Sequence, residues 1–462
     1  MKAIACCLLL ALSAAARESY PVDWSQLEPE ILEYFTTLLK IDTSNPPGNE
    51  TNAAQAIRAI LERGGVSSQL FALEPARANL VARIKGNGSK RPILLMGHTD
   101  VVGAQRERWT VDPFAAISKN GFIFGRGAVD DKDHAVADLM TMLLLQRLHV
   151  KLNRDVIFLA EAGEEGTPRV GIDYMIREHW PEIDAEYALA EGGSIAEENG
   201  KVHHVLIATT EKVPRGVRLV ATGVAGHGSR PIMQNAVVHL ASAVARAGTW
   251  QTPMRLNAAT RTYFERLAAI SPPALAARYR QILDPARAAQ ADQWFREHEP
   301  GHYSIVRTSV VPTILKAGFR SNVIPSEAEA YLDVRALPDE DMPRFLAELK
   351  RVIGDPSVAA SFAQAEGRPA SPPSRIDTDL FHALEAVGRR MFNAPTLPGM
   401  LTGATDNAQL RARGVQAYGF GPIIASSDPL GGAHSDDERI ATQSLMKMVE
   451  YLWNTVLEVG TN

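Results

Sequence analysis

Residues 91–102 read RPILLMGHTDVV, and residues 125–133 read GRGAVDDKD. The apolar run at 92–96 has no helical period and ends at a glycine, as a buried strand of a parallel sheet does. His98 follows this strand directly, and Asp130 follows the Gly-Arg-Gly turn just before an apolar helix. Taken alone, the two side chains are most simply a core histidine and a helix cap. Imidazole and carboxylate groups at a strand end of an α/β fold are also ligands suited to zinc.

Two further predicted strands end in acidic residues. Residues 155–160 (DVIFLA) and 187–190 (YALA) are short apolar runs of the length expected for buried strands. The first leads to Glu164 and Glu165, and the second leads to Glu191. Because parallel strands end at the same edge of a sheet, these acids and His98 are candidates for a common site.

The strands alternate with segments of helical periodicity. This alternation predicts an α/β fold with a mostly parallel sheet flanked by helices. Residues 79–84 and 92–96 lie on either side of a Gly-Asn-Gly turn, so we expect these two strands to pair with each other.

A change of pattern near residue 214 predicts a second unit inserted into the first. Residues 214–368 contain alternating strands and an amphipathic helix, which are typical of an α+β lid with one antiparallel sheet. The catalytic domain would then comprise residues 18–213 and 369–462. Within the lid, residues 249–301 are helical and rich in Ala and Arg. This segment could shape a pocket for large acyl groups, although packing alone is the simpler interpretation.

The N-terminus and the composition limit where the protein works and what it binds. Residues 1–17 combine a lysine, a short apolar run and small residues, which predict a signal peptide and export to a periplasm or the extracellular space. Its removal would take away both cysteines, Cys6 and Cys7. The apolar run is too short to span a membrane. The net charge is −5 and no basic run occurs, so we expect no nucleic-acid partner.

The polar groups at the strand ends have the composition of a two-metal site. Two histidines and three carboxylates can hold two zinc ions that share one bridging carboxylate, and a further carboxylate beside them can act as a general base. Adjacent Glu164 and Glu165 could supply both a ligand and the base. His434, in the sequence AHSDDE at 433–438, offers the second imidazole.

Five motifs in this order carry a resemblance to a known family: GHTDVV, GRGAVDDK, EAGEEG, AEGG and AHSDDE. The sequence resembles the M20 family of metallopeptidases, which includes glutamate carboxypeptidase, aminoacylase-1, succinyl-diaminopimelate desuccinylase and carnosinase-like dipeptidases. The resemblance implies two zinc ions per subunit, with Co²⁺ or Mn²⁺ as substitutes. It also implies that Glu164 is the general base and that Asp100 orients His98. The implied metal ligands are His98 and Glu191 for one ion, Glu165 and His434 for the other, and Asp130 as the bridge.

The resemblance extends to the lid and implies a homodimer. His227, in GVAGHGS, resembles the lid histidine that reaches the active site of the partner subunit and stabilises the oxyanion. Asn322 in SNVIP and Arg335 in DVRALP resemble a pair that holds the carboxylate of the substrate. Gly403, in TGATD, resembles a backbone donor to the same carboxylate.

Two positions differ from the pattern common in that family. Asp133 stands where many members have glycine, and helix capping is a sufficient explanation for it. The motif around His434 reads HSDDE instead of HxPNE, and the acids at 436–438 are most simply a solvated helix start.

The sequence therefore predicts a zinc-dependent hydrolase that cleaves the amide bond of a peptide or N-acyl-amino acid carrying a free carboxylate. Glu191, as a Glu in place of an Asp, favours a carboxypeptidase or aminoacylase within the resemblance. An aminopeptidase or dipeptidase on the same fold is the alternative, and it would need an anchor for a free amine. A non-catalytic binding protein is a second alternative, but it would normally have lost a ligand or the base.

Overall fold

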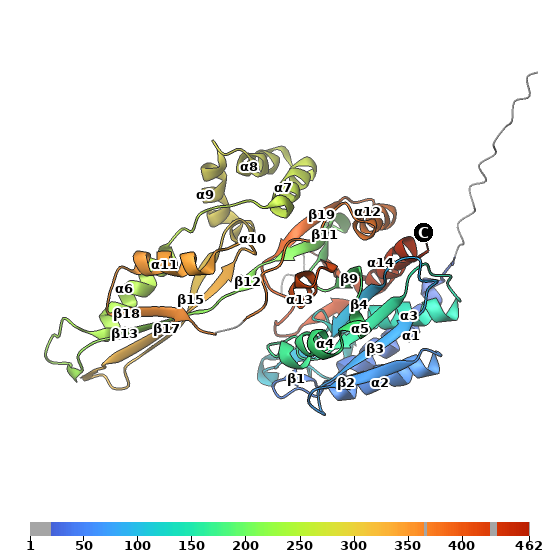
Figure 1. The fold of residues 1–462 in the computed structure, drawn as a ribbon, viewed down its shortest axis with the longest axis horizontal. Helices are drawn as coiled ribbons and strands as arrows, with labels where there is room; N and C mark the ends of the chain where they lie inside the picture. Colours follow the sequence, from blue (N-terminus) through green and yellow to red (C-terminus); the bar gives the residue numbers. More distant parts are fainter. Residues whose placement is uncertain (1–19, 365–366, 426–431, 462) are drawn as a thin grey trace, which may run out of the picture.

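The computed structural model describes residues 20–364, 367–425 and 432–461. The predicted signal peptide, with Cys6 and Cys7, lies outside the described residues. Among the described helices, none has the length and apolar character needed to cross a membrane. Figure 1 shows a rounded body on the right, where the C-terminus lies, and an elongated lid that extends from it to the left.

The body is built on a ten-stranded mixed sheet whose centre is parallel. Strands β8, β4, β9 and β20 lie side by side and run parallel. The order along the sheet is β2 (Ser68–Ala72), β3 (Ala78–Ile84), β8 (Val156–Glu161), β4 (Ile93–His98), β9 (Tyr187–Ala190), β20 (Gln416–Gly419), β11 (Lys201–Glu211), β10 (Ser194–Glu198) and β21 (Ile423–Ala425), with β19 (Thr396–Leu401) beside β11.

The predicted pairing of residues 79–84 with 92–96 is wrong. Strand β8 lies between β3 and β4 and pairs with both, antiparallel to β3 and parallel to β4. The turn at residues 86–88 joins strands that are adjacent in sequence but separated in the sheet. A central strand is apolar on both faces whichever strands lie beside it, so its sequence does not identify its neighbours. The turn at 86–88 therefore could not show that β8 lies between β3 and β4.

Helices cover both faces of this sheet, and each face has its own apolar core. One face is covered by α1 (Trp24–Leu39), α2 (Glu50–Arg63), α3 (Lys132–Arg147), α12 (Asp379–Phe392) and α14 (Thr442–Gly460). The other carries α4 (Ile172–Glu178), α5 (Trp180–Ile183) and α13 (Asn407–Ala412). Short elements complete the body: β1 (Ser44–Asn45), β5 (Val101–Val102), β6 (Ile117–Lys119), β7 (Phe122–Phe124), β22 (Arg439–Ala441) and the 3₁₀ turns η1 (Arg106–Arg108) and η2 (Pro168–Val170).

The start of α3 packs directly on the end of β4. A Cβ added at Gly97 would lie 2.7 Å from the backbone nitrogen of Ala135, so only glycine allows this approach. Every residue of α3 from Lys132 to Leu145 is buried, which explains why apolar residues occur on all sides of the helix and not on one face alone. The close packing brings the loop before α3, with Asp130, next to His98.

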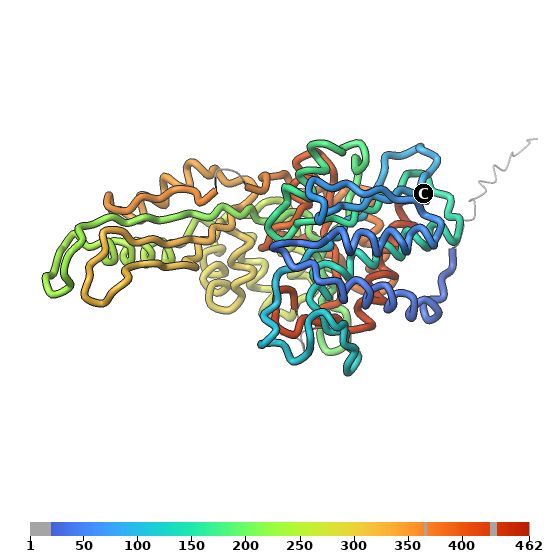
Figure 2. Tube along the Cα trace, turned by 90° about the horizontal axis from the view of Figure 1, so that it is seen from below, coloured from blue at the N-terminus to red at the C-terminus, as the bar shows by residue number. Residues whose placement is uncertain are grey.

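The lid has a separate antiparallel sheet and a core of its own. Its strands are β12 (Val213–Pro214), β13 (Val217–Thr222), β15 (Ser309–Ala317), β17 (Glu327–Ala336) and β18 (Val358–Phe362), and α6 (Ala236–Thr249) and α11 (Met342–Ile353) pack on this sheet. A two-stranded pair, β14 (Gly226–His227) and β16 (Val323–Ile324), follows at the far end. Only Lys212 separates β11 of the body from β12 of the lid. Figure 2 shows how far the lid projects.

Four helices between the lid strands pack against the body. They are α7 (Ala258–Ile270), α8 (Pro273–Leu283), α9 (Ala288–His298) and α10 (Pro300–Ile305), and we call them the helical group. Phe264 and Phe295 stack in their core, which also contains Leu397 and Met400 of β19. These helices therefore pack on the large sheet, through β19.

Candidate functional site

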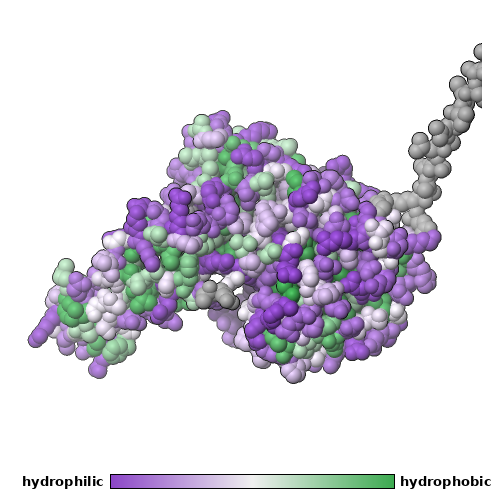
Figure 3. All heavy atoms as spheres, in the orientation of Figure 1, coloured by the Kyte–Doolittle hydropathy of each residue, from purple (hydrophilic) through white to green (hydrophobic). Residues whose placement is uncertain are grey.

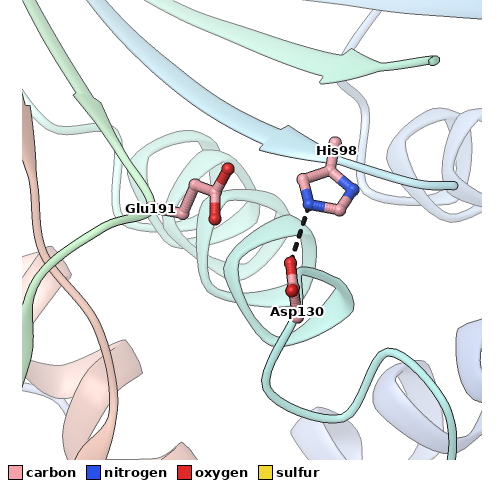
Figure 4. A group of neighbouring side chains, drawn as sticks. All are labelled: His98, Asp130 and Glu191. Atoms are coloured by element: carbon pink, nitrogen blue, oxygen red, sulfur yellow. Dashed lines mark hydrogen bonds and ion pairs between the residues drawn. The ribbon is translucent and has the colours of Figure 1, made fainter. Parts of the chain in front are cut away.

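The parallel centre of the large sheet brings three strand ends together. Strands β8, β4 and β9 are neighbours, and His98 is in register with Glu161 at the ends of β4 and β8. Glu191 follows β9 directly. Figure 4 shows the side chains of His98, Asp130 and Glu191 pointing toward one another from β4, the loop before α3 and the end of β9.

Asp130 lies between two histidines. Its Oδ1 is 3.0 Å from Nε2 of His98, and its Oδ2 is 3.1 Å from Nε2 of His434. Nε2 of His434 is also 2.8 Å from Oε1 of Glu165. Two sets of potential ligand atoms that lie within 4.8 Å of one another include Asp130: His98, Asp130 and Glu191, and Asp130, Glu165 and His434. His98, Glu164 and Glu165 form a further set in the same cluster. Asp130 is the member common to the first two sets.

The imidazoles and carboxylates of this cluster shift one another's pKa values. Although burial alone would lower it, hydrogen bonds to Asp100 and Asp130 raise the pKa of His98 well above its ordinary value. Hydrogen bonds to Asp130 and Glu165 raise the pKa of His434 to about 10. Burial, followed by the charge of Glu164, raises the pKa of Glu191. Imidazole nitrogens and carboxylate oxygens in two sets with a shared member fit a pair of divalent metal ions.

Asp100 fixes both the histidine and the acidic loop. Its backbone oxygen is 2.9 Å from Nδ1 of His98, so that ring presents Nε2 to Asp130. Its carboxylate accepts hydrogen bonds from the backbone nitrogens of residues 163, 164 and 165 at 3.0–3.1 Å. Asn45, which the sequence analysis did not single out, donates to Asp100 Oδ2 at 2.8 Å. The only sequence signal of Asn45 was its place in the Pro-rich breaker after α1.

Glu164 is held by an arginine that sequence reasoning missed. Nη2 of Arg368 lies 2.5 Å from Oε1 of Glu164, and the same guanidinium also binds Asp406. Burial raises the pKa of Glu164 to about 8, against the opposing charge of Arg368. A carboxylate whose pKa lies near neutrality suits a group that both accepts and returns a proton. Arg368 is 204 residues from Glu164 in sequence, so no spacing rule could link them.

Two interpretations of acidic residues near the site are wrong. Asp133 is fully buried, with its carboxylate 3.7 Å from Nδ1 of His134, and Asp131 occupies the N-cap position of α3. Glu438 is also fully buried instead of solvated. It pairs with Arg126 at 2.5 Å and accepts a hydrogen bond from the backbone of Val129, which ties it to the loop that carries Asp130.

The substrate-binding candidates lie at opposite ends of the lid. Arg335 pairs in register with Pro214 beside the body, and its Nε is 2.9 Å from Oδ1 of Asp333. His227 and Asn322 lie together at the far end, where the backbone of Gly228 donates to the oxygen of Asn322 at 2.8 Å. The strand from 327 to 335 alone spans about 27 Å. One chain therefore does not bring Asn322 and Arg335 together.

Gly403 lies in the loop between β19 and α13, beside the metal-binding candidates. Asn407, the first residue of α13, donates from Nδ2 to the backbone oxygen of Glu191 at 3.1 Å. The backbone nitrogen of Thr405 donates to Glu211 Oε1 at 2.8 Å. These contacts fix the segment after Gly403 against the ends of β9 and β11.

Comparisons with known proteins agree with this geometry. The model of the family described as "Peptidase family M20/M25/M40" matches residues 94–458. The human N-fatty-acyl-amino acid synthase/hydrolase PM20D1 is 28% identical over 391 residues, covering 81% of this chain and 75% of that protein. Human aminoacylase-1 is 26% identical, covering 90% and 92%. The solved M20 family metallo-carboxypeptidase Sso-CP2 from Sulfolobus solfataricus superposes with a TM-score of 0.71 at 18% identity, covering 93% and 99%.

The chain therefore belongs to peptidase family M20/M25/M40, and it is an amidohydrolase of that type. Proteins of this family are generally dependent on a dinuclear metal site, and the two ligand sets around Asp130 fit that requirement.

We expect the metal-free protein to bind two divalent ions and to release protons as it does so. His98 and His434 carry raised pKa values in the metal-free state, so binding displaces their protons and its affinity increases with pH. Calorimetry in buffers of different ionisation enthalpy measures the proton release, and elemental analysis measures the metal content.

The His434→Ala variant should lose one of the two ions. His179, which lies 2.9 Å from Tyr174 away from the cluster, provides the matched control, and His179→Ala should keep both. Equal metal content in the two variants would contradict the assignment of His434.

Proposed function

We propose that this protein is a zinc-dependent hydrolase that cleaves the amide bond of N-acyl-amino acids or peptides with a free carboxylate. The observation that carries the proposal is the pair of ligand sets sharing Asp130, with the buried Glu164 beside them. The relatives named as N-fatty-acyl-amino acid synthase/hydrolase and as aminoacylase-1 support the substrate class.

His98, Asp130 and Glu191 would hold one ion, and Asp130, Glu165 and His434 the other. Bound ions of this kind polarise an amide carbonyl and lower the pKa of water toward neutrality. Glu164 accepts the proton of the attacking water and returns it to the departing amine. Arg368 engages Oε1 of Glu164 and leaves Oε2 for the proton transfer. Asp100 keeps His98 and the acidic loop in place during the reaction.

Arg335 is the proposed anchor for the free carboxylate. A guanidinium offers a planar, two-pronged partner for that anion. Arg335 is partly exposed at the body end of the lid, so a substrate can reach it. The loop at Gly403 would add a backbone donor from the body.

A homodimer would supply the remaining groups. His227 and Asn322 lie at the far end of the lid of their own chain, so we propose that those of a second copy reach the site. Strand β15 pairs with β17 and with no other strand among the described residues, and its Val311 and Leu315 are more than half exposed. Val238 on α6, which packs beside β15, is 58% exposed. Figure 3 shows apolar side chains on the outer surface of the lid. An unpaired apolar edge of this kind favours association with a second copy.

We also propose that the protein is exported. The proposal rests on residues 1–17, whose lysine, apolar run and small residues have the pattern of a signal peptide.

Paired substrates test the proposed reaction. We expect hydrolysis of N-acyl-amino acids or dipeptides but not of their C-terminal amides, and complete loss of activity with a chelator. Glu164→Gln should lower kcat by about 10²–10⁴-fold, the usual contribution of a general base, with the metal content unchanged. Glu178→Gln, on the exposed surface of α4, is the matched control and should keep full activity. Equal rates on acids and amides would reject the carboxylate anchor and favour an aminopeptidase.

Disrupting the lid edge tests the dimer. The double change Val238→Glu and Leu315→Glu should convert the protein to a monomer, because charge at a buried apolar interface is strongly unfavourable. Sedimentation equilibrium measures the molecular mass. The activity of the monomeric variant should fall, because the partner's His227 and the partner's Asn322 no longer reach the site. Ile117→Glu, at an exposed apolar position on the body, should change neither. A fully active monomer would contradict the contribution of a second copy.

A further inference from the structure

A cavity of about 360 Å³ lies between the helical group and the large sheet. Tyr263, His302 and Ile305 line it from the helices, and Leu206, Met400 and Leu401 line it from β11 and β19. Its volume falls within the range of about 300–1,000 Å³ that is usual for small-molecule sites. The helices that build this cavity thus do more than pack on the sheet.

This cavity adjoins the metal-binding cluster. A second cavity, of about 530 Å³, is lined by Asp130 and Glu191, and the two cavities share Gly192 and Leu401 as walls. Gly192 has a φ of +111°, and an added Cβ would lie 3.3 Å from Leu401 Cδ2. Because Gly192 has no side chain, no Cβ stands between the two cavities at this point. A substrate whose amide lies at Asp130 can extend past Gly192 into the smaller cavity.

Tyr263, His302 and Glu299 on the cavity wall form a connected polar group. The hydroxyl of Tyr263 lies 2.9 Å from Nε2 of His302, and Glu299 accepts a hydrogen bond from Tyr279 at 2.9 Å. Glu299 and His302 also form an ion pair. Because these groups satisfy each other, the rest of the wall determines what fits. It is formed mainly by Leu, Ile, Met and Ala side chains and by glycines, with Thr402 as its one further polar side chain. That surface suits an apolar occupant.

We propose that this cavity binds an apolar chain of the substrate, extending from the amide at the metal-binding cluster past Gly192. The inference rests on the proposed function and adds the part of the substrate that the helical group selects. The chain could come from the acyl group or from the side chain of the amino acid, since both are attached next to the amide.

Gly301 offers a way to fill the cavity without disturbing the fold. It lines the cavity at the start of α10, and an added Cβ would meet no atom within 4 Å. The changes Gly301→Ala, Gly301→Leu and Gly301→Trp form a graded series of increasing bulk. Ala289, exposed on α9 of the same helical group, gives the matched control Ala289→Trp.

The experiment compares two series of substrates on the metal-loaded full chain. One series lengthens the acyl group of N-acylglycine from acetyl to octanoyl, and the other lengthens the side chain of N-acetyl-amino acids from alanine to 2-aminodecanoic acid. In the wild type, kcat/KM should rise about fourfold for each methylene that the cavity buries, in one of the two series. That series identifies the source of the chain.

The readout is the ratio of kcat/KM for the longest and the shortest member of that series. Gly301→Trp should lower this ratio about tenfold or more, the effect of excluding roughly two methylenes, and Gly301→Leu should lower it less. Ala289→Trp should leave the wild-type ratio. An unchanged ratio in both series for all Gly301 variants would overturn the proposal while leaving the proposed function standing.

Binding separates a failure of this inference from a failure of the proposed function. Calorimetric titration of the same compounds into the Glu164→Gln protein needs no turnover. If no substrate is hydrolysed by the wild type, the proposed function fails, and the cavity is then judged by affinity alone. Affinity that rises with chain length and is lost in Gly301→Trp would support the cavity as a binding site, and affinity independent of length would overturn it.

Discussion

The site depends on the close contact between the end of β4 and the start of α3. Gly97 permits that contact, because a side chain there would collide with the backbone of Ala135. The contact places Asp130 3.0 Å from His98 and within reach of His434, which comes from a segment over 300 residues later. A carboxylate held between two imidazoles is the feature around which the other acidic groups are arranged.

Buried polar contacts then fix each distant segment against this centre. Asp100 holds the loop with Glu164 and Glu165 through backbone hydrogen bonds. Glu438 and Arg126 join the segment after His434 to the loop before Asp130. Such contacts cost desolvation energy and contribute modestly to stability, but they leave few alternative arrangements of the groups that they connect. In this protein they keep the candidate metal ligands of five separate segments in one place.

Much of this arrangement was predictable from the sequence, and the exceptions have physical reasons. Short apolar runs that end in His98 or in acids predicted the strands, and parallel strands necessarily end at one edge. The order of strands was not predictable, because the apolar sequence of a buried strand does not determine which strands it pairs with. Strand β8 therefore lies between β3 and β4 without any sign of this in the sequence. Arg368 and Asn45 were missed because their partners are remote in sequence. The burial of Asp133 and Glu438 was missed because acids near a helix start are usually solvated. The separation of Asn322 from Arg335 could not be predicted, because it follows from the pairing of β17 with β12 at one end of the lid and of β14 with β16 at the other.

Anomalous diffraction from crystals of the purified protein, collected on both sides of the zinc absorption edge, tests the central claim most directly. We expect two zinc peaks about 3.5–4 Å apart, on either side of Asp130. One peak should lie near His98 and Glu191 and the other near Glu165 and His434. A single peak away from Asp130, for example at the buried group of Asp131, Asp133 and His134, would contradict it.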